Sequence, residues 1–151
     1  MLKRGIKKIF LESVRDFTSL GNPVILALIS LVLLGFSFVF WQLIFGLILV
    51  EVFCTIIKIF FHRGRPRKEE YSNLLEKISA GSFPSLHTAR SAFVFLVLSF
   101  LSSDVVIKTI FIVLMILIGA SRVILKKHYV SDVFAGLVIG ALASLLWRIL
   151  I

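Results

Sequence analysis

Four long apolar runs, separated by polar segments of different lengths, occupy most of the chain after residue 22. They are Pro23–Phe61, Ser85–Leu101, Val105–Ile124 and Tyr129–Leu150. As one helix, Pro23–Phe61 would be about 60 Å long, twice the roughly 30 Å thickness of the hydrocarbon core. We therefore expect it to break near Gly35–Ser37 into a hairpin of two spans, the first of them short. The pattern predicts an all-α bundle of about five transmembrane helices.

The first 22 residues have a different pattern. In Met1–Leu20, apolar residues recur at helical spacing among basic ones. This pattern is typical of an amphipathic helix on the membrane surface, with a frayed basic tail as the alternative. Gly21-Asn22-Pro23 is a turn signal and a helix start. We expect one integral-membrane domain over 1–151, with an interfacial helix at 1–22 and a transmembrane core at 23–151.

Composition supports a membrane protein over a soluble one. Of 151 residues, 59% are hydrophobic, and the mean hydropathy is +1.06. A net charge of +9 can indicate nucleic-acid binding, but here the basic residues flank runs of membrane length, so we expect no nucleic-acid partner. The single cysteine, Cys54, excludes an internal disulfide. The charged start is followed by Glu12, Arg15 and Asp16, which is unlike a signal peptide.

Three polar features modify this outline. Glu51 lies inside an apolar run, where an acid is costly, so we expect it to pair with a basic or hydroxyl group. Asp104 precedes a run and is a predicted helix cap. His62–Phe83 is a long polar segment in which a small amphipathic helix is predicted around Tyr71, Leu74, Leu75 and Ile78.

The most informative polar stretch is Ser121–Asp132, between two apolar runs. His128 and Asp132 are four residues apart and share one helical face if the following helix begins by about Tyr129. A carboxylate there can hold one imidazole nitrogen and leave the other as a nucleophile or base. The alternative is an interfacial histidine that only caps a helix.

Two further motifs suit an anion. Lys58 and Arg65 lie two helical turns apart before Pro66, where a cation pair can clamp a phosphate or merely anchor the helix. For Arg63, Arg67 and Lys68 we prefer the anchoring role. Pro84-Ser85-Leu86-His87 opens the next helix, whose N-terminal N–H groups form an anion site. Ser85 adds a hydroxyl, and His87 adds a proton donor or acceptor.

Alternation of the spans places all these residues on one side of the membrane. The site would combine three cations (Lys58, Arg65 and Arg122), two histidines, a carboxylate and a helix N-terminus. This set suits phosphoryl transfer, in which cations neutralise phosphate oxygens, one histidine attacks phosphorus and the other protonates the leaving oxygen. The alternative interpretation is a zinc site formed by His87, His128 and Asp132. The three cations would repel a zinc ion, so we predict no metal and no cofactor.

Together the three motifs resemble the signature of the type 2 phosphatidic acid phosphatase superfamily. Its pattern is Lys-x6-Arg-Pro, Pro-Ser-x-His and Ser-Arg-x5-His-x3-Asp, and all three spacings occur here within Lys58–Asp132. The resemblance implies a metal-free membrane lipid phosphatase with His128 as nucleophile, Asp132 orienting it and His87 as acid. It also implies phosphate binding by Lys58, Arg65, Ser85, the Leu86 N–H and Arg122. The family commonly has Gly in place of Leu86 and six spans instead of five.

The implied partner is a membrane lipid that carries a phosphate or diphosphate. Phosphatidic acid, phosphatidylglycerophosphate, undecaprenyl diphosphate and lipid A phosphate all fit. A phosphotransferase using the same phosphohistidine and a scaffold that only binds anionic lipids are the alternatives. Fifteen of the 17 Lys and Arg residues lie on the site's side, which predicts a cytoplasm-facing site in the plasma membrane. Many members of the family are thought to work on the outer face, and the two arguments conflict.

Overall fold

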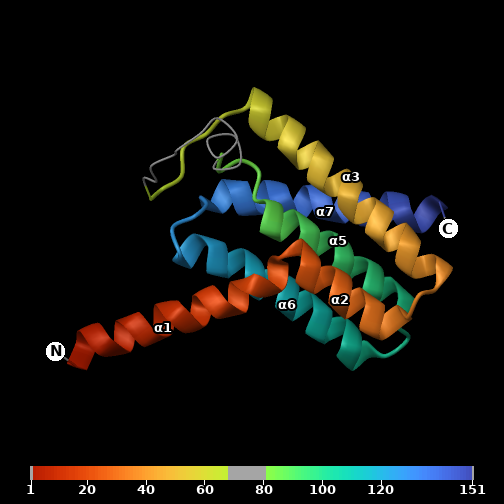
Figure 1. Ribbon diagram of the computed structural model, residues 1–151, viewed down its shortest axis with the longest axis horizontal. Helices are drawn as coiled ribbons and strands as arrows, with labels where there is room; N and C mark the ends of the chain where they lie inside the picture. The colour runs from red at the N-terminus through yellow and green to blue at the C-terminus, as the bar shows by residue number, and fades with distance from the viewer. Residues whose placement is uncertain (1, 68–80, 151) are drawn as a thin grey trace.

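The computed structural model describes residues 2–67 and 81–150, and all regular structure in these ranges is helical (Figure 1). The predicted amphipathic helix around Tyr71–Ile78 lies outside the described residues. The elements are α1 (Leu2–Thr18), the short 3₁₀ helix η1 (Ser19–Gly21), α2 (Pro23–Leu34), α3 (Phe38–Phe60), α5 (Leu86–Leu101), α6 (Val105–Ile124) and α7 (Val130–Leu150).

The helix boundaries follow from local capping residues. Asn22 accepts a hydrogen bond from the Val24 N–H, with Pro23 at the first position of α2. The predicted break in the first apolar run is confirmed: α2 ends at Leu34, Gly35 has φ of 60°, and Ser37 caps α3. Asp104 caps α6 as predicted, accepting from two backbone N–H groups.

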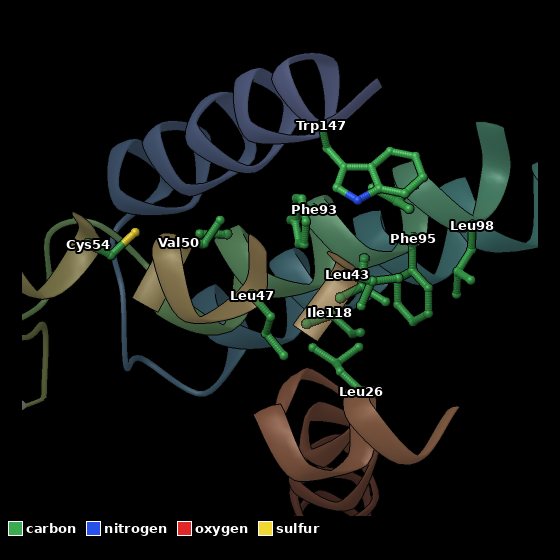
Figure 2. Packing of buried hydrophobic residues seen from close by; sticks show 13 residues of the cluster. Leu26, Leu43, Leu47, Val50, Cys54, Phe93, Phe95, Leu98, Ile118 and Trp147 are labelled. Atoms are coloured by element: carbon green, nitrogen blue, oxygen red, sulfur yellow. The ribbon is translucent and has the colours of Figure 1, made fainter. Parts of the chain in front are cut away.

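Helix α5 runs through the middle of the bundle and packs against α2, α3, α6 and α7 (Figure 1). Eleven of its 16 residues are buried, among them the polar Thr88, Arg90, Ser91 and Ser99. Figure 2 shows Phe93 and Phe95 of α5 among apolar side chains of the surrounding helices. Because protein surrounds this helix, its polar side chains meet other protein groups instead of lipid.

Two glycines of α7 permit a very close approach to α5. A Cβ at Gly136 would lie 2.6 Å from the Ser85 carbonyl oxygen, and one at Gly140 would lie 2.4 Å from the Ala89 carbonyl oxygen. Small residues four positions apart are a common device for close helix packing in membranes. Near the starts of the two helices, the Ser85 N–H also donates to the Asp132 carbonyl oxygen (3.0 Å).

Three of the described helices, α3, α6 and α7, are long and apolar enough to cross a membrane. Ile6–Gly21 and α2 form a pair bent by 62°, which is a fourth candidate if it is one broken span, and α5 is a shorter apolar helix. The chain is thus a polytopic helical membrane protein. The five-span count and the surface position of α1 stay predictions, since α2 has only 12 residues.

The expected pairing of Glu51 is confirmed, and its partner is Arg90 of α5. The Nε and Nη2 atoms of Arg90 donate to the two oxygens of the Glu51 carboxylate. The Arg90 side chain is 9% exposed and that of Glu51 is 40% exposed. This fork-shaped ion pair joins α3 to α5 one turn beyond His87.

Candidate active site

The end of α3, the start of α5, the end of α6 and the start of α7 meet at one end of the bundle (Figure 1). The predicted site residues lie at these four helix ends or in the loops beside them. Backbone contacts tie the loops together: Ser82 N–H donates to the Arg63 carbonyl (2.8 Å), and Arg67 N–H donates to the Lys126 carbonyl (3.1 Å). The structure brings the three motifs together at one end of the bundle, as predicted; the count of spans behind that prediction stays a prediction.

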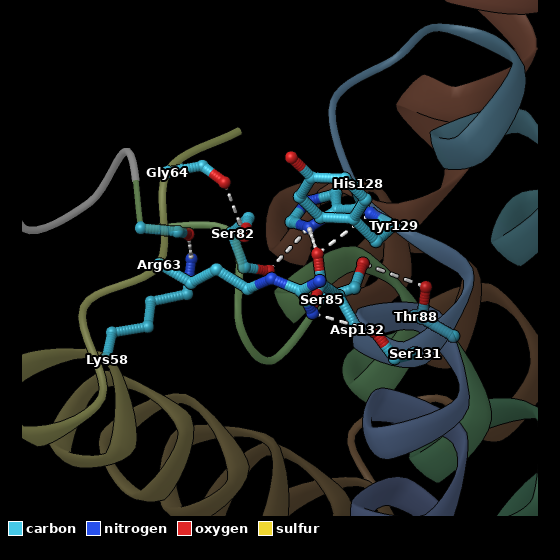
Figure 3. Close-up of polar contacts among 11 residues, drawn as sticks. Lys58, Arg63, Gly64, Ser82, Ser85, Thr88, His128, Tyr129, Ser131 and Asp132 are labelled. Carbon is cyan, nitrogen blue, oxygen red and sulfur yellow. Dashed lines mark hydrogen bonds and ion pairs between the residues drawn. The ribbon is translucent and has the colours of Figure 1, made fainter. Parts of the chain in front are cut away.

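His128 lies in the loop before α7, and its side chain is almost fully buried. Its Nδ1 atom lies 2.6 Å from the Ser82 carbonyl oxygen (Figure 3). Because a carbonyl can only accept, Nδ1 carries the hydrogen in this bond and Nε2 of a neutral ring keeps its lone pair. The bond therefore fixes the tautomer that a nucleophilic Nε2 requires.

The environment keeps this imidazole neutral. Burial, the largest cause, and the positive charge of Arg122 together lower the pKa of His128 from 6.5 to about 3, although the bond to Ser82 acts in the opposite direction. Lys58 and Arg65 also lower this pKa through their charges. All three predicted phosphate-binding cations thus act on the ring electrostatically.

Asp132 is fully buried in the first turn of α7. Its Oδ2 accepts from the Tyr129 N–H (2.8 Å), and its Oδ1 accepts from Arg63 Nη1 (2.9 Å). Oδ2 lies 3.9 Å from His128 Nδ1, beyond hydrogen-bond distance. The expected direct bond is not formed, because α7 begins at Val130 and His128 precedes the helix. The carboxylate instead faces the ring as a nearby negative charge.

Arg63 is a site residue that the sequence did not indicate. We expected it to anchor the helix, but its Nη1 donates to Ser131 Oγ (2.7 Å) and to Asp132, and its guanidinium lies 4.1 Å from the centre of the Tyr129 ring (Figure 3). These partners lie more than 60 positions away, so no local pattern separates Arg63 from Arg67.

The other cations are held by groups from distant segments. The buried Lys58 side chain donates from Nζ to the Gly81 carbonyl (2.7 Å). Arg122 is also buried, and its Nη1 donates to Thr18 Oγ1 at the end of α1 (3.3 Å). Arg65 follows α3 and is partly buried. The site's positive charge is therefore positioned by the loop before α5 and by the N-terminal helix.

Ser85 is the N-terminal residue flanking α5, and Leu86 and His87 lie in its first turn. The first N–H groups of a helix lack acceptors within that helix. Ser85 is buried, and its Oγ lies 2.9 Å from Thr88 Oγ1. His87 packs against Gly21, where an added Cβ would come within 3.1 Å of the His87 Cβ. Sequence reasoning missed both Thr18 and Gly21.

Among the described residues, no three His, Cys, Asp or Glu side chains gather as a metal-binding cluster. In particular, the arginine contact of Asp132 occupies one oxygen of the carboxylate that a zinc site would need. The donor set around His128 is cationic, which suits an anionic ligand better than a divalent cation.

The fold and the site define a helical membrane protein with a cationic, histidine-containing site at one end of its bundle. A family model described as the PAP2 superfamily matches residues 39–151, so the chain belongs to this family. It is a membrane lipid phosphatase of the PAP2 type.

Two solved structures share the fold. One is a transmembrane PAP2-type phosphatidylglycerolphosphate phosphatase from Bacillus subtilis, with a TM-score of 0.74 and 24% identity over 93% of this chain and 76% of that one. The other is LpxE from Aquifex aeolicus, with a TM-score of 0.77 and 28% identity over 93% of this chain and 86% of that one.

Proposed function

We propose that the protein hydrolyses a phosphate monoester or diphosphate on a membrane lipid through a phosphohistidine at His128, without a metal. Nε2 of His128 attacks phosphorus, and the bond from phosphorus to the lipid oxygen breaks. His87 gives its proton to that leaving oxygen. Water then attacks the phosphohistidine, the bond between phosphorus and Nε2 of His128 breaks, His87 takes a proton from the water, and inorganic phosphate leaves.

The observation that carries the proposal is the 2.6 Å contact between His128 Nδ1 and the Ser82 carbonyl oxygen. It supports a neutral ring with its Nε2 lone pair available, in a site where cations attract the phosphate. A histidine that only capped a helix would need neither this tautomer nor the surrounding positive charge.

The remaining residues have complementary roles in this proposal. Lys58, Arg65 and Arg122 bind the phosphate oxygens, together with the Ser85 hydroxyl and the Leu86 N–H. Asp132 stabilises the positive charge that the His128 ring gains during attack, acting across 3.9 Å. At Leu86, where the family commonly has Gly, the change of side chain leaves the backbone donor in place.

The substrate class that fits best is a lipid whose phosphate lies at the bilayer surface. The described part of the chain offers little structure outside the helices to hold a large soluble headgroup. Phosphatidic acid, phosphatidylglycerophosphate and undecaprenyl diphosphate meet this condition. The distribution of basic residues supports a site on the cytoplasmic face of the plasma membrane.

The test is phosphate release by purified, detergent-solubilised protein from those three lipids, with and without EDTA. We expect release that resists EDTA and disappears in His128→Ala. Loss of release with EDTA would overturn the metal-free mechanism. If the lipid loses phosphate only when an acceptor alcohol is added, the protein is a transferase.

Substitutions separate binding from chemistry. His128→Ala removes the nucleophile and should abolish turnover while lipid binding persists. Asp132→Asn should slow turnover by about 10²-fold or more, because it removes a buried charge next to the reacting ring. Arg122→Ala should impair both binding and rate. Lys108→Ala, at the opposite end of α6, is the matched control and should retain full activity.

A further inference from the structure

The turn between α1 and α2 contacts the site directly. Thr18 is buried, although it ends a helix whose other described residues are mostly exposed. Its Oγ1 accepts from Ser121 Oγ (2.8 Å) and from Arg122 Nη1 (3.3 Å). A hydroxyl in this position fixes one end of the guanidinium that is expected to bind phosphate.

Gly21 makes the second contact. An added Cβ there would lie 3.1 Å from both Cβ and Cδ2 of His87 and 3.1 Å from the Ile118 Cγ2. The backbone of η1 therefore packs directly on the histidine that we assign as the acid. A side chain at this position would displace His87 by a few tenths of an ångström or more.

The connection between α1 and α2, which makes these contacts, is short. Only the three residues of η1 and Asn22 lie between α1 and α2, and the Asn22 N–H donates to the Ser19 carbonyl (2.8 Å). The segment Ile6–Gly21 and helix α2 meet at an angle of 62°. Any tilt of α1 is thus transmitted to Thr18 and Gly21 with little attenuation.

The far end of α1 has the chemistry of a membrane-surface helix. Ile6, Ile9 and Phe10 are exposed by 61%, 65% and 54%, and Lys7 and Lys8 beside them are exposed as well. Figure 1 shows α1 projecting from the bundle at the end that holds the site. An apolar face with adjacent lysines binds an anionic lipid surface.

We propose that the Thr18–Gly21 turn positions Arg122 and His87, and that binding of α1 to an anionic bilayer surface holds this turn in its active geometry. Thr18 and Gly21 are positioning residues: they act through Arg122 and His87. The inference rests on the proposed function, because the active geometry is that of the proposed phosphatase site. The affinity of this site for a phosphate mimic can nevertheless be measured without turnover.

The first arm measures binding of orthovanadate, a phosphate mimic, by thermal shift of the full-length protein in detergent. Thr18→Val keeps the shape of the side chain and loses the hydroxyl, and we expect vanadate affinity to fall about tenfold. Thr18→Ser should stay within about twofold of wild type. In an Arg122→Lys background, Thr18→Val should cause little further loss, because the geometry that it supports is already gone.

Unchanged vanadate binding in a folded Thr18→Val protein would overturn the positioning role. An equal loss in Thr18→Val with and without Arg122→Lys would do the same, since the two sites would be independent. If wild type binds vanadate but releases no phosphate from any lipid, the proposed function fails while the positioning role is still measurable.

The second arm tests the membrane dependence in proteoliposomes of phosphatidylcholine alone or with phosphatidylglycerol. We expect vanadate to bind more tightly to wild type than to Lys7→Gln/Lys8→Gln in anionic vesicles, and equally in neutral ones. Lys108→Gln, which removes a basic residue at the other end of the bundle, is the control for total charge and should match wild type. Identical behaviour of the double variant and wild type in anionic vesicles would overturn the coupling to the bilayer.

Discussion

Substituting Gly136 by alanine should separate α5 from α7 where the two helices hold the site. The new Cβ would lie 2.6 Å from the Ser85 carbonyl oxygen, whereas ordinary van der Waals contact begins at 3.4 Å. The obstacle is backbone, which cannot rotate away, so α7 has to move outward. A displacement approaching 1 Å between groups that act together costs on the order of 10²-fold in rate.

We therefore expect kcat/KM of Gly136→Ala for the best lipid substrate to fall about 100-fold. Overpacking should also destabilise the protein by about 1–3 kcal/mol. The assay is phosphate release from mixed micelles, combined with a thermal melt to establish that the variant is folded at the assay temperature. Gly64→Ala is the matched control: apart from its chain neighbours, no atom of residues 2–67 or 81–150 lies within 4 Å of its new Cβ, so the same chemical change should have little effect on rate.

Gly140→Ala tests whether the loss of activity in Gly136→Ala comes from a change in the site geometry or from poorer helix packing in general. Its Cβ would meet the Ala89 carbonyl oxygen at 2.4 Å, one turn further from the site. We expect it to lower stability at least as much as Gly136→Ala and to lower the rate less. A folded Gly136→Ala protein with activity within about threefold of wild type would refute the reasoning that this helix contact sets the site geometry.

Three further predictions follow from individual groups. The unfolded chain binds a proton at His128 below pH 6.5, whereas the folded protein does so only near pH 3. The free energy of unfolding should therefore fall as the pH falls between these values, by at most about 1.4 kcal/mol per pH unit. Thermal melts of wild type and His128→Asn over this pH range measure the effect, and equal slopes for the two proteins would contradict it. Arg63→Ala should destabilise the protein by ~1 kcal/mol, since the ion pair of Arg63 is partly screened by solvent. It should also reduce turnover, and Arg63→Lys should reduce turnover less. Wild-type stability and turnover in Arg63→Ala would show that Arg63 has no role in the site. A cysteine at position 62 reports on the side of the membrane that holds the site, and one at position 103 reports on the opposite side. In a Cys54→Ser background, an impermeant maleimide should label Ser103→Cys but not His62→Cys in intact cells. The reverse result would place the site on the outer face.

The sequence predicted those parts of the fold that depend on nearby residues. The chain reverses at Gly35–Ser37 because a glycine with positive φ and a serine cap lie next to each other there. The fourth predicted span coincides with α6 because Asp104 caps its first turn. Gathering of the motifs at one end was also predictable, because consecutive helices joined by short connections alternate in direction.

The predictions fell short where distant segments meet. The carboxylate of Asp132 was expected on the His128 ring, but the carbonyl of Ser82, 46 positions away, takes that hydrogen bond. The residues around Arg63 and Arg67 do not indicate which of the two belongs to the site, and only the fold brings the first of them to Tyr129. Helix periodicity gives no information on which residues of two remote helices become neighbours.

The close seating of α7 against α5 has a consequence for how the protein is made. Chains are synthesised from the N-terminus, so α1, α3, α5 and α6 leave the ribosome before His128 and the helix that follows it. In the proposed mechanism, a nascent chain at that stage holds cations and His87 but not the nucleophile, His128. Under that proposal, turnover begins only when α7 docks through Gly136 and Gly140, and an incompletely inserted chain does not attack the lipids around it.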